Sequence, residues 1–308
     1  MAHMVETMAY AGEVPWHGLG HKVPNDLSTD QMMVAAGLDW TVEKKQAYIN
    51  VGDRKVAINA QALVRSSDDS VLDVVTNEWN PVQNVEAFDF FREFVEAGDM
   101  EMHTAGALRD GQIVWCLAKV KDSFDLFGGD QVDSYMLFTN PHRFGQSLDI
   151  RFTPIRVVCN NTLTLAMRSE STGQNFKLTH RREFVADQAK VAMGIAHEKL
   201  DKYRDMAKFL GSKRYNNETI TEYFSRLFPA SKDKMSKRAG ASLEVLHTQP
   251  GAEFAEGSWW QAFNAVTFQT DHTFGRTADT RLQSAWFGAN RQLKLDALEL
   301  AVEYANAA

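Results

Sequence analysis

The chain of 308 residues has only two cysteines, Cys116 and Cys159, and neither belongs to a CxxC pair. Both stand in apolar, strand-like runs, which favours reduced core thiols over a disulfide or a cysteine metal site. No run of 18 apolar residues is present, so we expect no membrane span. The first twenty residues lack a charged segment followed by an apolar one, so we expect no signal peptide.

Common nucleotide-binding and hydrolytic motifs are missing as well. The sequence has no GxxxxGK[ST] phosphate loop, no GxGxxG after a strand and no GxSxG elbow. Its acidic residues are numerous but scattered, without a close pair that requires acid–base chemistry. We therefore expect a protein without catalytic residues and without a cofactor.

Histidines offer the few candidates for a metal site. His17 and His21 stand four apart, a spacing at which two helical histidines share a metal, but the proline and glycines around them disfavour a helix. His142, Asp149 and His180 would meet only if the intervening hairpin folded back. A metal-dependent nuclease built on these residues is the minor alternative, and we expect no metal.

Charge is distributed unevenly along this acidic chain, whose net charge is −7. Residues 1–142 carry 22 acidic against 10 basic side chains, residues 143–182 carry seven basic against two acidic, and the remainder carries 16 of each. A basic block interleaved with Asn, Thr, Ser and Phe indicates a local anionic partner. The alternative is a strand pair with a solvated charged face.

Hydrophobic periodicity predicts an α+β fold. A helix is expected over residues 81–97, with Asn80 as its cap, Pro81 at its first position and Gly98 at its end. The element order predicts one twisted, mainly antiparallel sheet over residues 40–168 with this helix packed on one face. Strands are expected at 40–51, 55–65, 71–76, 102–109, 112–120, 132–139, 148–153 and 155–165.

The second half of the chain is predicted to be mostly helical, at 187–210, 220–228, 257–268 and 293–304. We expect an α+β core domain over 1–185 and a helical region over 186–308. The polar segment 231–242 predicts a mobile loop with a possible phosphate contact. Asp271 and His272 are expected to cap a helix or lie on the surface. Trp259, Trp260 and the leucine-rich tail predict a buried contact, with a second subunit as the favoured partner.

Several long sequence segments resemble those of a phage- and plasmid-borne family, domain of unknown function 932. They are MAHMVETMAYAGEVPWHGLGHKV, NEWNPVQNVEAFDFFREFVEAG, TAGALRDGQIVWCLAKV and TPIRVVCNNTLTLA, and a looser match covers GRTADTRLQSAWFGANRQLKLDALELA. The resemblance covers most of residues 1–170. It implies an accessory protein of a mobile element that acts in the bacterial cytoplasm after DNA entry or during replication.

The order of three strands, a helix and further strands also resembles, more loosely, the core of single-strand annealing proteins of the RecT and Red-beta type. That resemblance implies rings or filaments with a basic groove for DNA, although no annealase motif transfers residue by residue.

Our leading hypothesis is a homo-oligomeric protein that binds and anneals single-stranded DNA in recombination or replication. Guanidinium and ammonium groups would hold phosphates, Phe144 would stack on a base, and two asparagines would add polar contacts. The second hypothesis is a protein-binding module that counters host defence or diverts host machinery, with the acidic first 142 residues as its surface. The residues predicted to contact DNA are Arg143, Phe144, Arg151, Arg156, Asn160, Asn161, Arg168, Lys177, Arg181 and Arg182.

Overall fold

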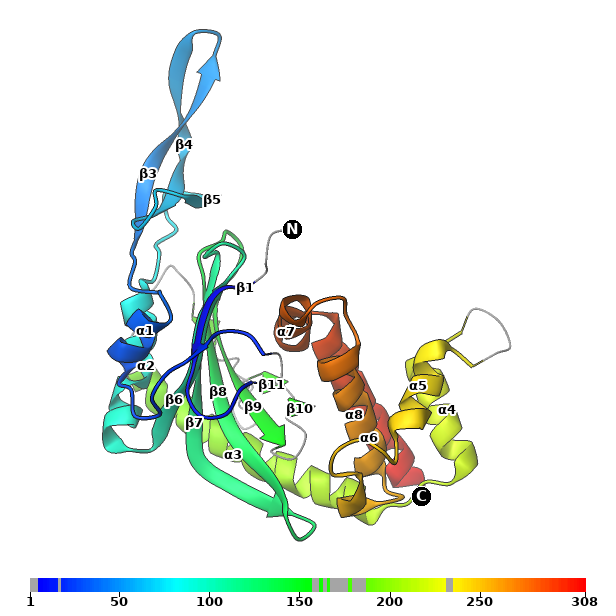
Figure 1. Cartoon of the computed structure of the whole chain (residues 1–308). Coiled ribbons are helices and arrows are strands. Elements are labelled where there is room, and N and C mark those ends of the chain that lie inside the picture. Colours follow the sequence, from blue (N-terminus) through cyan, green and yellow to red (C-terminus); the bar gives the residue numbers. More distant parts are fainter. Residues whose placement is uncertain are drawn as a thin grey trace.

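The structure, a computed structural model, describes residues 5–15, 18–156, 161–162, 165–166, 177–178, 187–230 and 235–308. Its fold is α+β, as predicted, with mainly antiparallel strands first and helices after them (Figure 1). The described strands are β1 (Val5–Tyr10), β2 (His21–Lys22), β3 (Val42–Val51), β4 (Arg54–Arg65), β5 (Val71–Val75), β6 (Met100–Leu108), β7 (Ile113–Leu126), β8 (Asp130–Pro141), β9 (Leu148–Arg156), β10 (Asn161–Thr162), β11 (Leu165–Ala166) and β12 (Lys177–Leu178). The described helices are α1 (Thr29–Ala35), α2 (Asn84–Ala97), α3 (Asp187–Ser212), α4 (Asn217–Leu227), α5 (Lys237–Val245), η1 (Ala252–Ala255), α6 (Trp259–Phe268), η2 (Gln269–Thr273), α7 (Ala278–Phe287) and α8 (Ala289–Ala307).

The larger sheet has the strand order β10-β9-β8-β7-β6-β1-β2, and β11 and β12 also pair with β9. All these pairs are antiparallel except β1 with β2. Strand β1, which the sequence analysis did not predict, lies against β6 far along the chain. Gly106 makes this pairing possible, because a Cβ atom there would come within 2.4 Å of the Thr7 carbonyl oxygen.

The expectation of one sheet over residues 40–168 is wrong for its first three strands. Strands β3, β4 and β5 form a separate sheet, and the β3–β4 hairpin projects away from the body (Figure 1). Its base is anchored by buried Val42, Leu63 and Leu72. Further out, most side chains on both faces are exposed or only half-buried, so this part of the hairpin has no apolar face to pack against the larger sheet.

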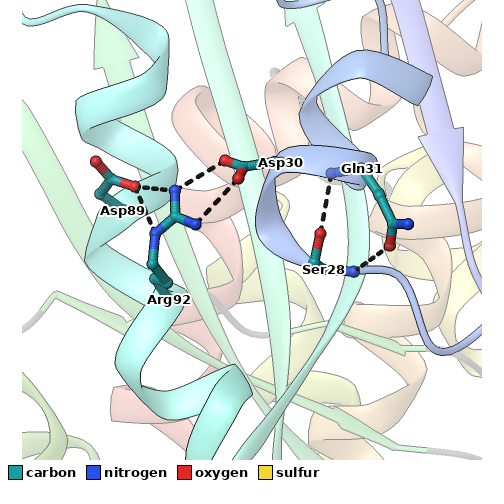
Figure 2. A network of polar contacts seen from close by, with 5 residues as sticks. All are labelled: Ser28, Asp30, Gln31, Asp89 and Arg92. Carbon is teal, nitrogen blue, oxygen red and sulfur yellow. Dashed lines mark hydrogen bonds and ion pairs between the residues drawn. The ribbon is translucent and has the colours of Figure 1, made fainter.

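Helices α1 and α2 cover one face of the larger sheet. Phe88, Phe90 and Phe91 of α2 join Met32 of α1 and strand residues such as Cys116 in one core cluster. A salt-bridged arginine also links the two helices (Figure 2): Arg92 donates to both carboxylate oxygens of Asp30, at 3.0 and 2.8 Å, and its Nε donates to Asp89 at 2.8 Å. Helix α1 itself begins with a capping box in which the Ser28 amide donates to Gln31 and the Gln31 amide donates back (Figure 2).

Helix α2 ends at Gly98, as predicted, with φ 77°. Its start differs from the prediction, because the cap is Gln83 and not Asn80. The Gln83 amide N–H donates to Glu86 at 2.6 Å. Its side chain also accepts from the Val42 amide and donates to the Val42 carbonyl, at 2.9 and 3.0 Å. These bonds to β3 hold residues 80–83 outside the helix.

The opposite face of the sheet is covered by α7. Trp115 and Leu117 point away from the α2 side because successive strand residues alternate between faces, and they pack with Leu282 and Trp286 of α7. The rings of Trp115 and Trp286 meet edge to face, with centroids 4.8 Å apart.

The remaining helices form a third cluster around Trp259 and Trp260, which are each 1 % exposed. The expected subunit contact for these two residues is therefore wrong, since the protein's own core buries them. Trp259 lies among tyrosines, stacked on Tyr304 at 5.0 Å, and the indole N–H of Trp260 donates to Asp130 at 3.2 Å. Tyr304 and Asp130 lie far from the two tryptophans in the sequence, so the local pattern around Trp259 and Trp260 could not reveal them.

Two other expectations for the helical region need correction. The predicted loop at 231–242 contains the start of α5, whose cap Ser236 accepts from the Ala239 amide at 3.1 Å; residues 231–234 lie outside the described residues. Asp271 is fully buried in the π-helical turn η2 and pairs with Lys294 at 2.8 Å, so it does not lie on the surface. No helix within the described ranges is long and apolar enough to cross a membrane.

Candidate nucleic-acid interface

The loop between β8 and β9 presents the aromatic residue that the sequence analysis selected. The Phe144 amide donates to Asp73 of β5 at 2.8 Å, and the His142 amide donates to the Gln112 carbonyl at 2.8 Å. These backbone bonds fix the loop, while the Phe144 side chain stays 57 % exposed. The neighbouring Arg143 is half-buried.

His142 does not contribute to this exposed surface. It is fully buried, its Nε2 lies 3.0 Å from Asn84 Oδ1, and its ring is 5.4 Å from that of Trp40. His142 contacts Asn84 of α2, whereas Asp149 contacts Arg151. These two residues therefore do not form the metal site that the sequence suggested for His142, Asp149 and His180. His17 and His180 lie outside the described residues, and the part of the chain that the structure describes contains no group of three metal-ligating side chains.

Arg151 lies on β9 in an ion pair. Its Nε donates to Asp149 at 2.6 Å and its Nη1 donates to the Trp286 carbonyl at 3.0 Å. The guanidinium group also lies over the Phe287 ring, 5.5 Å from its centroid. The partner of Asp149 is thus Arg151, two residues along the same strand.

A polar cavity of about 370 Å³ opens between this part of β9, the β8–β9 loop and the end of α7. Arg109 lies at its edge, in the β6–β7 turn with φ 54°. With the Gln283 amide turned so that its oxygen faces the guanidinium group, this oxygen accepts from Arg109 at 2.8 and 2.6 Å. Asp149, Arg151 and Phe287 also line this cavity.

A third guanidinium group reinforces the positive charge at this place. Burial and the charge of Arg151 lower the pKa of Arg291, and Asp149 opposes this effect. Arg109 lines the same cavity as Arg151 and Asp149, and the charges of Arg151 and Asp149 both act on Arg291. Two of these arginines, Arg109 and Arg291, lie outside the basic segment 143–182, and no local pattern in the sequence brings them together with it.

The other predicted contact residues are placed only by their backbone or not at all. Arg156 ends β9, where it is the register partner of Asn161 of β10, and Lys177 of β12 is the partner of Asp149. These three positions therefore lie, with Arg151, on β9 and the strands paired with it, spread along the length of β9. Asn160, Arg168, Arg181, Arg182 and Cys159 lie outside the described residues.

The fold and the cavity define an α+β protein whose main sheet carries helices on both faces and a cluster of arginines at the end of β9. A family model places it more closely: the chain belongs to the family described as Domain of unknown function (DUF932), which matches residues 71–286. The match includes Phe144, Arg109 and Arg151 but begins after the β3–β4 hairpin. No curated protein and no solved structure matches the chain.

Proposed function

We propose that this protein binds single-stranded DNA and aligns it for annealing, as a phage- or plasmid-encoded factor in the bacterial cytoplasm. The observation that carries the proposal is the excess of guanidinium groups at the 370 Å³ cavity, close to the exposed ring of Phe144. Burial, followed by the charge of Arg151, lowers the pKa of Arg291, and the phosphates of a bound strand would offset that positive charge. Exposed aromatic rings beside such groups are suited to stack on unpaired bases.

Annealing itself requires no catalytic residue, since the protein only has to hold two strands with their bases accessible. In a ring or filament, the arginine clusters of several copies would line up and form a continuous basic groove. The oligomer is part of this proposal, and its contacts would lie elsewhere than at Trp259 and Trp260, which the chain's own core already buries.

The salt dependence of binding tests the electrostatic part of the proposal. If Arg109, Arg143, Arg151 and Arg291 each neutralise one phosphate, log affinity should fall with log salt with a slope of about −3. The variant R109Q/R143Q should flatten this slope by about 1.4 and weaken binding similarly for all base sequences. Fluorescence anisotropy of a labelled oligonucleotide measures both quantities, and thermal melting shows that the variant is folded.

Matched controls separate this site from charge in general. R204Q removes an exposed arginine on α3 that pairs with Asp201, and it should leave affinity and slope unchanged. Phe144→Ala should weaken binding by about 1–3 kcal/mol without changing the slope, because stacking releases no counterions. A folded wild-type protein that does not bind at low salt would contradict the proposal, and cleavage of the oligonucleotide with magnesium would favour the nuclease instead.

One observation favours the second candidate, a protein-binding module that acts on host machinery. The outer part of the β3–β4 hairpin exposes Tyr48, Ile49, Val51 and Val56, each between 40 and 49 %. Apolar side chains on a projecting arm are suited to contact another protein. If shortening this arm abolishes the protein's activity in cells and leaves DNA binding intact, the second candidate is favoured.

A further inference from the structure

A second cavity, of about 410 Å³, lies on the α7-facing side of the larger sheet. Its floor follows a row of side chains on neighbouring strands, in which Lys119 is the register partner of both Glu101 and Tyr135. Trp286 of α7 forms part of its wall, and the segment after β1 reaches it with Glu13 and neighbouring residues. The volume is within the range of small-molecule sites, about 300–1,000 Å³.

Polar groups in this cavity are arranged in a connected cluster. Lys119 donates to Asp133 at 2.5 Å, and the Gln131 amide donates to the other Asp133 oxygen at 3.1 Å. Next to them, the His103 and Tyr135 rings meet edge to face with centroids 5.0 Å apart. Asp133 and Tyr135 are 7 % and 6 % exposed, whereas Lys119 is half-buried and Gln131 is exposed, so this cluster reaches from the interior of the cavity to the surface.

Three buried polar atoms of the lining residues have no hydrogen-bond partner among the described residues. They are Nδ1 of His103, Oγ1 of Thr104 and Nε1 of Trp286. A buried polar group without a partner costs about 1–3 kcal/mol, so a ligand that shifts the lining enough to reach these atoms and supplies the partners would be favoured. The indole N–H only donates and a hydroxyl can donate, so the ligand has to offer hydrogen-bond acceptors.

Charge in the cavity excludes anionic ligands. Burial, followed by the charge of Lys119, lowers the pKa of His103 to about 4, while Asp133 opposes this shift. The imidazole is therefore neutral at physiological pH. Lys119 is then the one cation among the lining residues, against Asp133, Glu101 and Glu13. A phosphate group would meet net negative charge here, in contrast to the arginine cluster beside β9.

The lining also favours a flat ring. Trp286, Tyr135 and His103 contribute aromatic surface, and Leu117 and Ile155 contribute apolar surface. Aromatic side chains stack on planar heterocycles of any base type. A cationic amine would be attracted to the carboxylates but could not accept a hydrogen bond from the indole N–H.

We propose that this cavity binds an uncharged nucleobase. The inference deepens the proposed function and rests on it for the source of the base, which would be a nucleotide of the bound strand. Trp286 connects the two places, because its side chain lines this cavity and its carbonyl accepts from Arg151 at the arginine cluster. Phosphates would remain at the arginines while one base enters between the sheet and α7.

The direct test is calorimetric titration of the full chain with the uncharged nucleosides and with the corresponding nucleoside monophosphates. We expect at least one nucleoside to bind saturably, with an affinity that salt hardly changes, and its monophosphate to bind more weakly. Tighter binding of the monophosphate, or competition by choline in place of a base, would overturn the assignment. So would the absence of binding by every nucleoside.

Two conservative variants locate the site. Tyr135→Phe removes only the hydroxyl group and should weaken nucleoside binding by about two- to tenfold. Thr104→Val removes the unpartnered hydroxyl, so it should weaken binding by a similar factor while the free protein becomes at least as stable as the wild type. Tyr10→Phe is the matched control, since Tyr10 packs on the same face of the sheet outside the cavity, and it should change nothing. Equal effects of all three variants would overturn the site.

Oligonucleotides with an abasic tract distinguish the source of the base. If the strand supplies it, the abasic tract should bind more weakly than the normal strand, and this difference should be smaller in Tyr135→Phe than in the wild type. Equal binding of both strands by the wild type, together with nucleoside binding, would overturn the strand as the source and leave a site for free nucleosides. Nucleoside binding without any oligonucleotide binding would contradict the proposed function alone.

Discussion

His103 links the interior charge of the protein to its stability. Its pKa is about 4 in the folded chain, lowered by burial and by Lys119, against about 6.5 for an ordinary histidine. As pH falls below about 6.5, the unfolded chain takes up the proton first, so the free energy of unfolding should decrease. The decrease should level off below about pH 4, after a total loss of about 3 kcal/mol.

Chemical denaturation of the wild type and of His103→Gln across this pH range measures the effect. The difference between the two proteins isolates the contribution of His103 from that of every other side chain. A difference that stays constant with pH would show that the imidazole is protonated equally in the folded and unfolded chain.

The buried pair Asp271–Lys294 gives a second prediction about single residues. Both side chains are 0 % exposed, and burial lowers the pKa of Lys294. Lys294→Met would leave the Asp271 carboxylate buried without this cation, which should cost about 3–5 kcal/mol. The combination D271N/K294M should recover much of the lost stability, because both buried charges are then removed.

Urea unfolding of the two single variants and of the combination completes this cycle. A loss below about 1 kcal/mol for Lys294→Met would contradict the prediction. The sequence placed Asp271 on the surface because its neighbours are polar. Its partner lies 23 positions later on α8, and periodicity within one helix does not reveal such a pair.

At the scale of elements, two glycines of α3 allow a matched comparison. A Cβ atom at Gly211 would lie 2.1 Å from Cζ of Phe127, whereas nothing lies within 4 Å of the same atom at Gly194. Gly194→Ala should stabilise the protein by up to about 1 kcal/mol through helix propensity. Gly211→Ala should instead destabilise it by about 1–3 kcal/mol, since the ring has to move.

Melting temperatures of both variants decide between these effects. If Gly211→Ala stabilises the protein as much as Gly194→Ala, α3 does not pack tightly against the β7–β8 turn. The sequence analysis expected this helix to end at residue 210, yet α3 continues to Ser212. The absence of a side chain at Gly211 serves a contact with Phe127 that only the folded chain shows.

Local signals predicted most elements near their true positions. The Asp110-Gly111 turn joins β6 to β7, and the Phe127-Gly-Gly turn joins β7 to β8. Strand β7 nevertheless continues to Leu126, six residues beyond its expected end, because β8 pairs with it along this length. Phe144 had no strand face on which to be buried, and its ring is exposed.

For the whole molecule, the larger sheet supplies residues to all three core clusters. Cys116 packs with α2, Leu117 packs with α7, and Leu126 packs with the Trp259 cluster. Because the three clusters share these strands, the loss of one cluster should destabilise the strands on which the other two clusters pack. We expect a single cooperative unfolding transition for the complete chain.

Tryptophan fluorescence and far-ultraviolet circular dichroism measured on the same thermal ramp should give the same midpoint. Two separated transitions would show that the helical region unfolds independently of the sheet. The fold class could be predicted from the sequence, whereas the second sheet and the packing of α7 could not. These features depend on contacts between segments as distant as Met8 and Trp286, which local patterns do not record.

The position of β1 in the sheet has a consequence for synthesis on the ribosome. This strand leaves the ribosome well before its antiparallel partner β6, which begins at Met100. At ordinary translation rates the delay is on the order of 5 to 20 s. During that time Met8 and Tyr10, which the finished fold buries, have no β6 to cover the strand. The nascent chain therefore exposes these apolar side chains until the sheet can close around the strand.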